Sequence, residues 1–233
     1  MRWTWALVAV AACAAPAPEA GLIDSVRGYA RLIAPGEADD PRVLEALAAV
    51  PRAEFVPGAW RHAAAEDRAL PIAHGQTISQ PTIVALMTHL LRVTPGDQVL
   101  EVGTGSGYQA AVLATMGARV FSIEILPDLA RAAAARLERL GLAVSVRVGD
   151  GGLGWPEEAP FDSIIVTAAA PRVPPALVAQ LRPGGRMVIP VGPEGEVQEL
   201  LLVEKAADGR LAERPVTDVR FVPLTGAERA GRP

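Results

Sequence analysis

Apolar, strand-like runs alternate with helix-like segments from Gln98 onward, and this alternation constrains the fold more than any other feature of the chain. Runs such as QVLEVG (98–103) and ARVFSIEI (118–125) are typical of short buried strands. The segment PDLARAAAARLERLG (127–141) repeats apolar residues at helical spacing, with Pro at its start and Gly at its end. Strands that alternate with helices predict an α/β fold with a doubly wound, mostly parallel sheet.

The remaining elements follow the same rhythm. Further strands are predicted at 144–151, 161–170, 186–192, 198–206 and 216–224. Helices are predicted at 22–33, within 41–60, and at 81–91, 105–117 and 174–185. The last two strands are separated by a short Gly-containing loop, which predicts a pair that forms an antiparallel edge of the sheet.

Composition bounds the class of protein. Of the 233 residues, 50% are hydrophobic, which allows a sizeable core and argues against a disordered chain. The formal net charge of −4 argues against broad attraction to nucleic acid, so we expect no such partner. The single cysteine, Cys13, excludes an intramolecular disulfide and a cysteine-cluster metal site, and we expect no metal.

A single domain is expected over residues 22–226. It divides into a small N-terminal part over 22–93, mostly helical, and an α/β core over 94–226. Residues 227–233 form a tail, and residues 1–21 form a signal-like or disordered leader.

The leader resembles a secretory signal, because Arg2 is followed by an apolar run from Trp3 to Ala12 and then by small residues and prolines. Residues 10–13 also resemble a lipoprotein processing site, at which Cys13 would be lipidated. The run is shorter than the roughly 20 apolar residues of a transmembrane helix, so we expect no stable membrane span. An alanine-rich leader that is not processed explains the same letters, and both interpretations stay open.

A glycine-rich turn follows the first strand of the predicted core. The sequence EVGTGSGYQ places Gly103, Gly105 and Gly107 between a strand and a helix, where glycine lets the backbone turn tightly and approach a ligand. The spacing differs from the G-x-G-x-x-G of dinucleotide-binding proteins, and no Gly-Lys-Ser/Thr follows as in a Walker loop. The loop indicates a nucleoside cofactor, with a plain strand-to-helix turn as the alternative.

Two acidic residues end neighbouring strands of the predicted sheet. Glu124 ends the second strand, where a carboxylate can accept hydrogen bonds from both hydroxyls of a ribose. Asp150 ends the third strand, where it could meet an adenine amino group, although a lone acid at such a position is often a helix cap. Together with the glycine loop, these acids favour a nucleoside site.

A polar stretch, QTISQ (76–80), precedes the helix that is predicted to begin at Pro81. Proline fits the first helical position, so Ser79 or Gln80 could cap the helix. The stretch could also hold a polar group of a substrate. The two interpretations are compatible, because a capped helix start fixes its hydroxyl and presents backbone N–H groups.

The motifs EVGTGSG, IEI, GDG, FDSIIVTAA and LRPGGRMVIPVG together resemble the Rossmann-like class I methyltransferases that depend on S-adenosyl-L-methionine. The blocks AVPRAEFVP, LPIAHGQTISQP and VRFVPL narrow the resemblance to the protein-L-isoaspartate (D-aspartate) O-methyltransferases, and GQTISQP is the most specific of them. The resemblance covers about residues 24–226. It implies methyl transfer from S-adenosyl-L-methionine to the α-carboxylate of L-isoaspartyl and D-aspartyl residues in damaged proteins, which starts repair through a succinimide.

The resemblance also implies roles for individual residues. It places the active-site residue at Ser79, and it implies substrate contacts from Thr77, Ile78, Gln80 and Arg220. The cofactor-binding residues that it implies are Glu101, Gly103, Thr104, Gly105, Ser106, Gly107, Glu124, Asp150, Gly151 and Thr167. It further implies that VRFVPL packs beside the site.

The chemistry favours a positioning role for Ser79. A free α-carboxylate has a pKa of about 3 to 4, so it is ionised at neutral pH and needs no general base. Neutral donors orient the carboxylate without stabilising an anion whose charge is lost as the ester forms. We therefore expect the Ser79 hydroxyl to hold the substrate and not to act as a nucleophile.

Three other functions compete with this one. A methyltransferase with another substrate class would need a different substrate loop, and a nicotinamide-dependent dehydrogenase would need other glycine spacing. An exported lipoprotein that binds ligands without catalysis agrees with the leader but not with the nucleoside-site residues. Because S-adenosyl-L-methionine is made in the cytoplasm, we expect a cytoplasmic monomer, with a periplasmic or lipid-anchored protein as the alternative.

Overall fold

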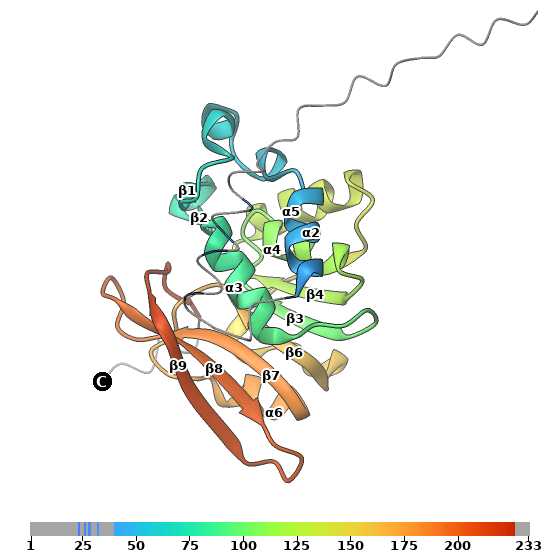
Figure 1. Cartoon of the computed structure of the whole chain (residues 1–233), viewed down its shortest axis with the longest axis vertical. Helices are drawn as coiled ribbons and strands as arrows, with labels where there is room; N and C mark the ends of the chain where they lie inside the picture. Colours follow the sequence, from blue (N-terminus) through green and yellow to red (C-terminus); the bar gives the residue numbers. More distant parts are fainter. Residues whose placement is uncertain (1–22, 24–25, 27, 29–31, 33–39, 227–233) are drawn as a thin grey trace, which may run out of the picture.

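The computed structural model describes residues 23, 26, 28, 32 and 40–226. The predicted leader at 1–21, most of the helix predicted at 22–33 and the tail at 227–233 lie outside these residues. A single seven-stranded sheet runs through the described part and carries helices on both faces (Figure 1). The predicted α/β class is confirmed.

The sheet has the strand order β5-β4-β3-β6-β7-β8-β9. The strands are β3 (Gln98–Val102), β4 (Arg119–Glu124), β5 (Val144–Val148), β6 (Phe161–Val166), β7 (Leu181–Val191), β8 (Gln198–Lys205) and β9 (Leu211–Val219). The first five in spatial order are parallel, while β8 runs antiparallel to β7 and β9 antiparallel to β8. The late strand pair therefore forms the predicted antiparallel edge.

Helices α2 (Pro41–Ala49), α3 (Pro81–Leu91), α4 (Tyr108–Thr115) and α5 (Pro127–Arg139) bury side chains in one core cluster, and α6 (Pro175–Gln180) buries Leu177 in the other. The clusters lie on opposite faces of the sheet, because alternate residues of β3 and β6 enter different clusters. Within the described residues, no helix is both long and apolar enough to cross a membrane.

The N-terminal part holds short elements that the sequence analysis did not predict. A two-stranded antiparallel sheet joins β1 (Leu70–Pro71) to β2 (Thr77–Ile78). Short 3-10 helices cover Arg52–Phe55, Gly58–Ala63 and Ala73–Gly75. These turns carry the chain from α2 to α3 and set the polar stretch at 76–80 against the carboxyl edge of the main sheet.

The bounds of two strands were predicted wrongly, and the helix expected at 174–185 ends at Gln180. The last strand was expected at 216–224 but spans Leu211–Val219, and the strand expected from Arg186 begins at Leu181. The first half of β9 is an exposed sheet edge without alternating apolar residues, and Pro215 sits there because an edge strand tolerates a missing donor. After Val219 the chain leaves the sheet.

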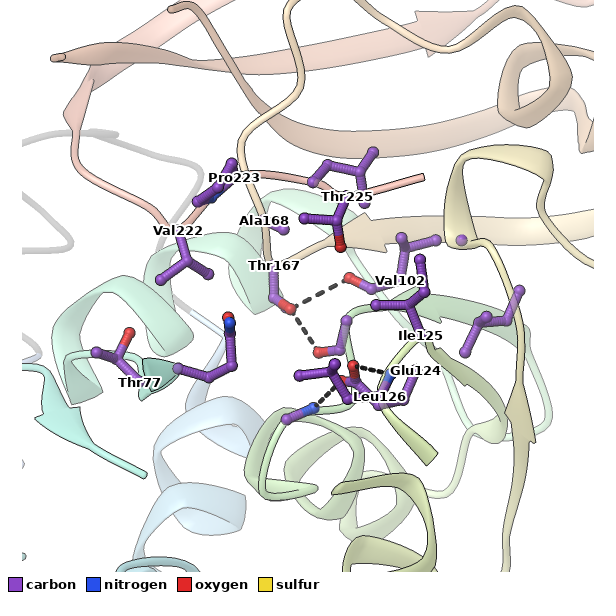
Figure 2. A pocket seen from close by; sticks show the side chains of 16 residues that line it. Thr77, Val102, Glu124, Ile125, Leu126, Thr167, Ala168, Val222, Pro223 and Thr225 are labelled. Carbon is purple, nitrogen blue, oxygen red and sulfur yellow. Dashed lines mark hydrogen bonds between the residues drawn. The ribbon is translucent and has the colours of Figure 1, made fainter. Parts of the chain in front are cut away.

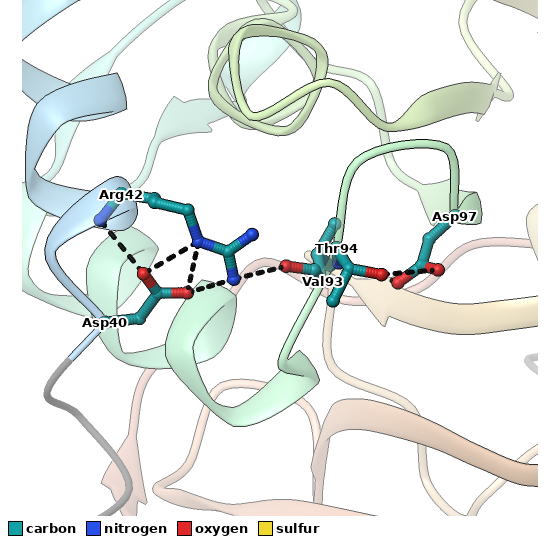
Figure 3. A network of polar contacts seen from close by, with 5 residues as sticks. All are labelled: Asp40, Arg42, Val93, Thr94 and Asp97. Atoms are coloured by element: carbon teal, nitrogen blue, oxygen red, sulfur yellow. Dashed lines mark hydrogen bonds and ion pairs between the residues drawn. The ribbon is translucent and has the colours of Figure 1, made fainter.

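A polar network fixes the start of α2 to the turn after α3 (Figure 3). The Asp40 carboxylate accepts hydrogen bonds from the Arg42 backbone N–H at 2.9 Å and from its Nε at 3.0 Å. The Arg42 guanidinium also donates to the carbonyl oxygen of Val93 at 3.1 Å. The hydrogen-bonded Arg42 side chain holds the pKa of the Asp40 carboxyl below its ordinary value.

Replacing Asp40 by alanine removes the cap of α2 and should lower the free energy of unfolding by about 1 kcal/mol at neutral pH. Because the pKa of Asp40 is lowered by folding, its contribution is fully present above the unfolded pKa of about 3.9 and is lost as the pH falls through the folded value. Urea unfolding of the two proteins should therefore give curves that converge in acid.

Asp208→Ala is the matched control for this effect. Asp208 accepts the same two hydrogen bonds, from the Arg210 backbone N–H at 3.1 Å and its Nε at 2.6 Å, but in the turn between β8 and β9. Equal destabilisation by both variants would show that helix capping is not the source.

Candidate functional site

The carboxyl ends of β3, β4 and β6 border a hollow with an empty volume of about 550 Å³ (Figure 2). Open α/β sheets bind ligands at this edge. Glu124 and Leu126 line one side of the hollow, and residues 222–225 lie across from them. The polar residues Gln76, Thr77 and Thr167 also line it, so the hollow offers both apolar walls and hydrogen-bonding groups.

The turn after β3 depends on glycine. Gly103 has a φ of +95°, and a Cβ atom there would lie 2.6 Å from Oγ1 of Thr167. That hydroxyl donates to the carbonyl oxygens of Val102 at 3.1 Å and Gly103 at 2.6 Å. Thr167 at the end of β6 therefore holds the glycine turn at the end of β3, and a larger residue at position 103 would separate them.

Glu124 orders the glycine loop from the end of β4. Its carboxylate accepts hydrogen bonds from the backbone N–H groups of Gly105 at 2.8 Å and Leu126 at 3.0 Å (Figure 2). A carboxylate has about four acceptor positions, so two remain for a ligand. Glu124 is buried and lines the hollow, so it can present a fixed acceptor to the hydroxyls of a ribose.

Other residues of the loop point elsewhere. Gly107 has a φ of +89°, and its Cα faces α5 so closely that a Cβ would lie 3.3 Å from a methyl carbon of Leu137. Thr104 and Ser106 line a small cavity between the glycine loop and the 77–79 segment, not the main hollow. The Ser106 carbonyl accepts a hydrogen bond from Arg136 of α5 at 2.8 Å, which ties the loop to that helix.

Glu101 lies beneath the loop and borders the same small cavity. It is fully buried, and the Ser122 hydroxyl donates to its carboxyl group while contacting the Thr104 hydroxyl at 2.6 Å. Burial raises the pKa of Glu101 to about 8; the Ser122 hydrogen bond opposes this shift and the charge of Glu124 adds to it. The carboxyl is therefore mostly protonated at neutral pH before any cation binds nearby.

Asp150 and Gly151 follow β5. The Asp150 carboxylate accepts the Gly152 backbone N–H at 2.9 Å, so it caps a short 3-10 helix, as the alternative interpretation of this acid held. A Cβ on Gly226 would lie 2.4 Å from that carboxylate, so the C-terminal segment passes directly beside it. Gly151 lines the main hollow, whereas Asp150 does not.

A second, open groove lies next to the hollow and has an empty volume of about 940 Å³. It brings together four of the predicted substrate residues, namely Thr77, Ser79, Gln80 and Arg220. The fifth, Ile78, is buried and faces the small cavity instead. Thr77 lines both the groove and the hollow, so it marks the boundary between them.

The start of α3 is not capped as predicted. Gln80 occupies the N-cap position but its side chain makes no capping bond, and the Ser79 hydroxyl makes none either. Instead, Asp67 accepts the Thr82 backbone N–H at 2.9 Å and the Gln80 side-chain amide at 3.0 Å. The interpretation in which the side chain of Ser79 or Gln80 caps the helix was wrong, because the carboxylate of Asp67, 15 residues before Thr82, supplies the capping bond.

Residues that the sequence analysis did not single out complete both sites. They are Ile125, Leu126 and Ala168 at the hollow, Val197 and Asp218 at the groove, and Arg52 and Asp67 behind the 77–82 segment. The position of Ile125 directly after Glu124 was the available signal for that residue. The block VRFVPL supplies Arg220 and Phe221 to the groove and Val222, Pro223 and Leu224 to the hollow.

Comparisons with known proteins agree with this arrangement. A family model described as protein-L-isoaspartate(D-aspartate) O-methyltransferase matches residues 8–229. The chain is 60% identical over 188 residues to protein-L-isoaspartate O-methyltransferase 1 of Cupriavidus necator, covering 80% of this chain and 73% of the relative. It is 61% identical over 190 residues to the protein of that name in Anaeromyxobacter sp., covering 81% and 90%.

Solved structures of proteins with this family name are also similar to the chain. A protein-L-isoaspartate O-methyltransferase superposes with a TM-score of 0.77 at 29% identity, covering 88% of this chain and 67% of that one. A Plasmodium falciparum protein described as the same enzyme, in complex with S-adenosyl-L-homocysteine, superposes with a TM-score of 0.73 at 27% identity, covering 88% and 97%. The chain belongs to the protein-L-isoaspartate(D-aspartate) O-methyltransferase family.

Proposed function

We propose that this protein transfers a methyl group from S-adenosyl-L-methionine to the free carboxylate of damaged aspartyl residues in proteins, which is the α-carboxylate of an L-isoaspartyl residue and the side-chain carboxylate of a D-aspartyl residue. The observation that carries the proposal is the adjacency of two sites: a hollow at the carboxyl edge of the sheet and an open groove that shares Thr77 with it. A protein substrate requires an open groove, and a nucleoside cofactor requires a more enclosed hollow.

The hollow fits the cofactor. Glu124 keeps acceptor positions for the ribose hydroxyls, and Gly103 and Gly105 let the backbone approach it. Apolar side chains such as Ile125 and Leu126 suit the faces of an adenine ring. We infer that Gly151 and Thr167 also contact the cofactor, and that Glu101, Thr104, Ser106, Gly107 and Asp150 support it from behind or from the margin. When bound, S-adenosyl-L-methionine supplies a methyl group that its sulfonium makes electrophilic.

The groove fits the substrate carboxylate. The Ser79 hydroxyl makes no hydrogen bond with another described residue, so it is available to donate to the carboxylate. Thr77 adds a second neutral hydroxyl at the boundary with the hollow. Arg220, directly after β9, lines the groove, where its guanidinium can bind the peptide substrate away from the reacting carboxylate. Orientation and exclusion of water, and not proton abstraction, are what these residues supply.

The steps that follow formation of the ester do not require the enzyme. The backbone amide nitrogen of the following residue attacks the ester carbonyl, methanol departs, and a succinimide forms. Its hydrolysis yields normal aspartate in part. These steps belong to the substrate, so the site needs no residue for them.

We also propose that the enzyme works as a monomer in the cytoplasm, where its cofactor is made. The signal-like leader with Cys13 opposes this location. N-terminal sequencing and mass analysis of the protein from its native cells distinguish the two: a mature chain that begins at a lipidated Cys13, or beyond it, would contradict the proposal.

Ser79→Ala should lower kcat on an isoaspartyl peptide by about a hundredfold, because it removes the donor that orients the reacting carboxylate. Initial rates of tritiated methyl transfer to two peptides, differing only in Asp against isoAsp, provide the measurement. Ser145→Ala, on an exposed position of β5 far along the sheet edge, is the control and should keep wild-type rates. Equal rates in the two variants would remove Ser79 from the site.

Glu124→Gln should weaken cofactor binding by about ten- to a hundredfold, because charge-assisted hydrogen bonds contribute roughly 1.5–3 kcal/mol. Isothermal titration calorimetry with S-adenosyl-L-homocysteine measures this without turnover. Glu204→Gln serves as the control, since Glu204 pairs with Arg186 on the strands away from the hollow. An unchanged Kd for Glu124→Gln would place the ribose elsewhere.

A further inference from the structure

Arg52 contacts the substrate segment from a fully buried position. It is 1% exposed, although it carries a guanidinium group. One terminal nitrogen donates to the carbonyl oxygen of Ser79 at 3.0 Å and to that of Arg68 at 2.9 Å. The other donates to the carbonyls of Ala64 at 2.8 Å and Glu66 at 3.4 Å. A single side chain thus joins the 64–68 segment to the backbone of Ser79.

Asp67 lies between two of the carbonyl groups that Arg52 holds, those of Glu66 and Arg68. Its own carboxylate accepts the Thr82 backbone N–H at 2.9 Å and the Gln80 amide at 3.0 Å, and it also accepts the Thr82 hydroxyl. Asp67 therefore accepts hydrogen bonds from the residues that follow Ser79, while Arg52 donates one to the carbonyl of Ser79 itself.

These two side chains fix the backbone around Ser79 but leave its hydroxyl without a hydrogen bond to another described residue. The backbone then fixes the position of Cβ of Ser79, and with it the few staggered positions that the hydroxyl can occupy. A misplacement of about 1 Å can cost a hundredfold in rate when a reaction depends on orientation. A brace of this kind would matter more for turnover than for affinity.

We propose that Asp67 and Arg52 are positioning residues of the methyl transfer, which hold residues 79–82 so that the Ser79 hydroxyl meets the substrate carboxylate. This inference rests on the proposed function. It assigns no direct substrate contact to either residue, since neither lines the groove or the hollow. Their effect passes through Ser79, Gln80 and Thr82.

Asp97→Asn provides a matched control. Asp97 accepts the Thr94 backbone N–H at 2.7 Å and the Thr94 hydroxyl at 2.9 Å (Figure 3). This is the same pair of contacts that Asp67 makes with Thr82, but in the turn before β3, at the opposite end of the strand from the site. A loss of kcat that comes only from removing a capped turn would appear equally in the variants of Asp67 and of Asp97.

The experiment compares the full-length wild type with Asp67→Ala, Asp67→Asn and Asp97→Asn. It measures kcat and KM for an isoaspartyl peptide, Kd for S-adenosyl-L-homocysteine and the thermal midpoint. We expect kcat to fall at least tenfold in Asp67→Ala and less in Asp67→Asn, which keeps one acceptor oxygen. The Kd should stay within twofold, and Asp97→Asn should keep the wild-type kcat.

Other outcomes decide against the inference. A kcat for Asp67→Ala no lower than that of Asp97→Asn would overturn it. A loss of cofactor affinity in Asp67→Ala as large as its loss of kcat would overturn it as well. If Asp67→Ala does not fold, Thr82→Val decides, because it keeps the backbone contact and loses only the buried hydroxyl contact. It should lower kcat about threefold, and an unchanged kcat refutes the brace. A wild type that binds cofactor but methylates no isoaspartyl peptide refutes the proposed function, and the inference with it.

Discussion

Every parallel strand of the sheet ends at the same edge, and there the backbone groups lose their ladder partners. The structure resolves this with side chains that also build the hollow. Thr167 occupies the carbonyls of Val102 and Gly103, and Glu124 occupies the N–H groups of Gly105 and Leu126. The loop is therefore ordered before any ligand arrives, which reduces the entropy that binding must overcome.

The N-terminal part depends on a different interaction. Burying a guanidinium is costly unless its donors find acceptors, and the two terminal nitrogens of Arg52 donate to carbonyl oxygens of the 64–68 segment and of Ser79. Its guanidinium also lies 5.9 Å from the ring centroid of Tyr108, which packs edge-on against Phe55. Since Tyr108 opens α4 directly after the glycine loop, one packed group of side chains supports both that loop and the segment around Ser79.

Local sequence patterns predicted the α/β class and the positions of α3, α4 and α5. Helix α5 carries an apolar stripe, α3 and α4 are largely apolar segments, and proline or glycine stands at the ends of all three. It failed where the partner is distant or the surface is polar. No feature of the neighbouring sequence indicates that Asp67 caps α3 through Thr82, 15 residues later. The polar residues before Pro215 likewise carry no pattern that predicts an edge strand. The glycine spacing predicted the turn after β3, but only the structure distinguishes Gly103, which lines the hollow, from Gly107, which faces α5.

The hollow and the groove share one wall. Thr77 belongs to both, and the segment from Asp218 to Thr225 lines the groove with its first residues and the hollow with its last. Under the proposed function, redesign of the peptide preference is therefore constrained, because changes along this wall alter the hollow at the same time. Ala69, Ile83 and Val197 line the groove but not the hollow and lie outside this wall, so under the proposed function they are sites at which substrate selectivity can be varied independently of cofactor affinity.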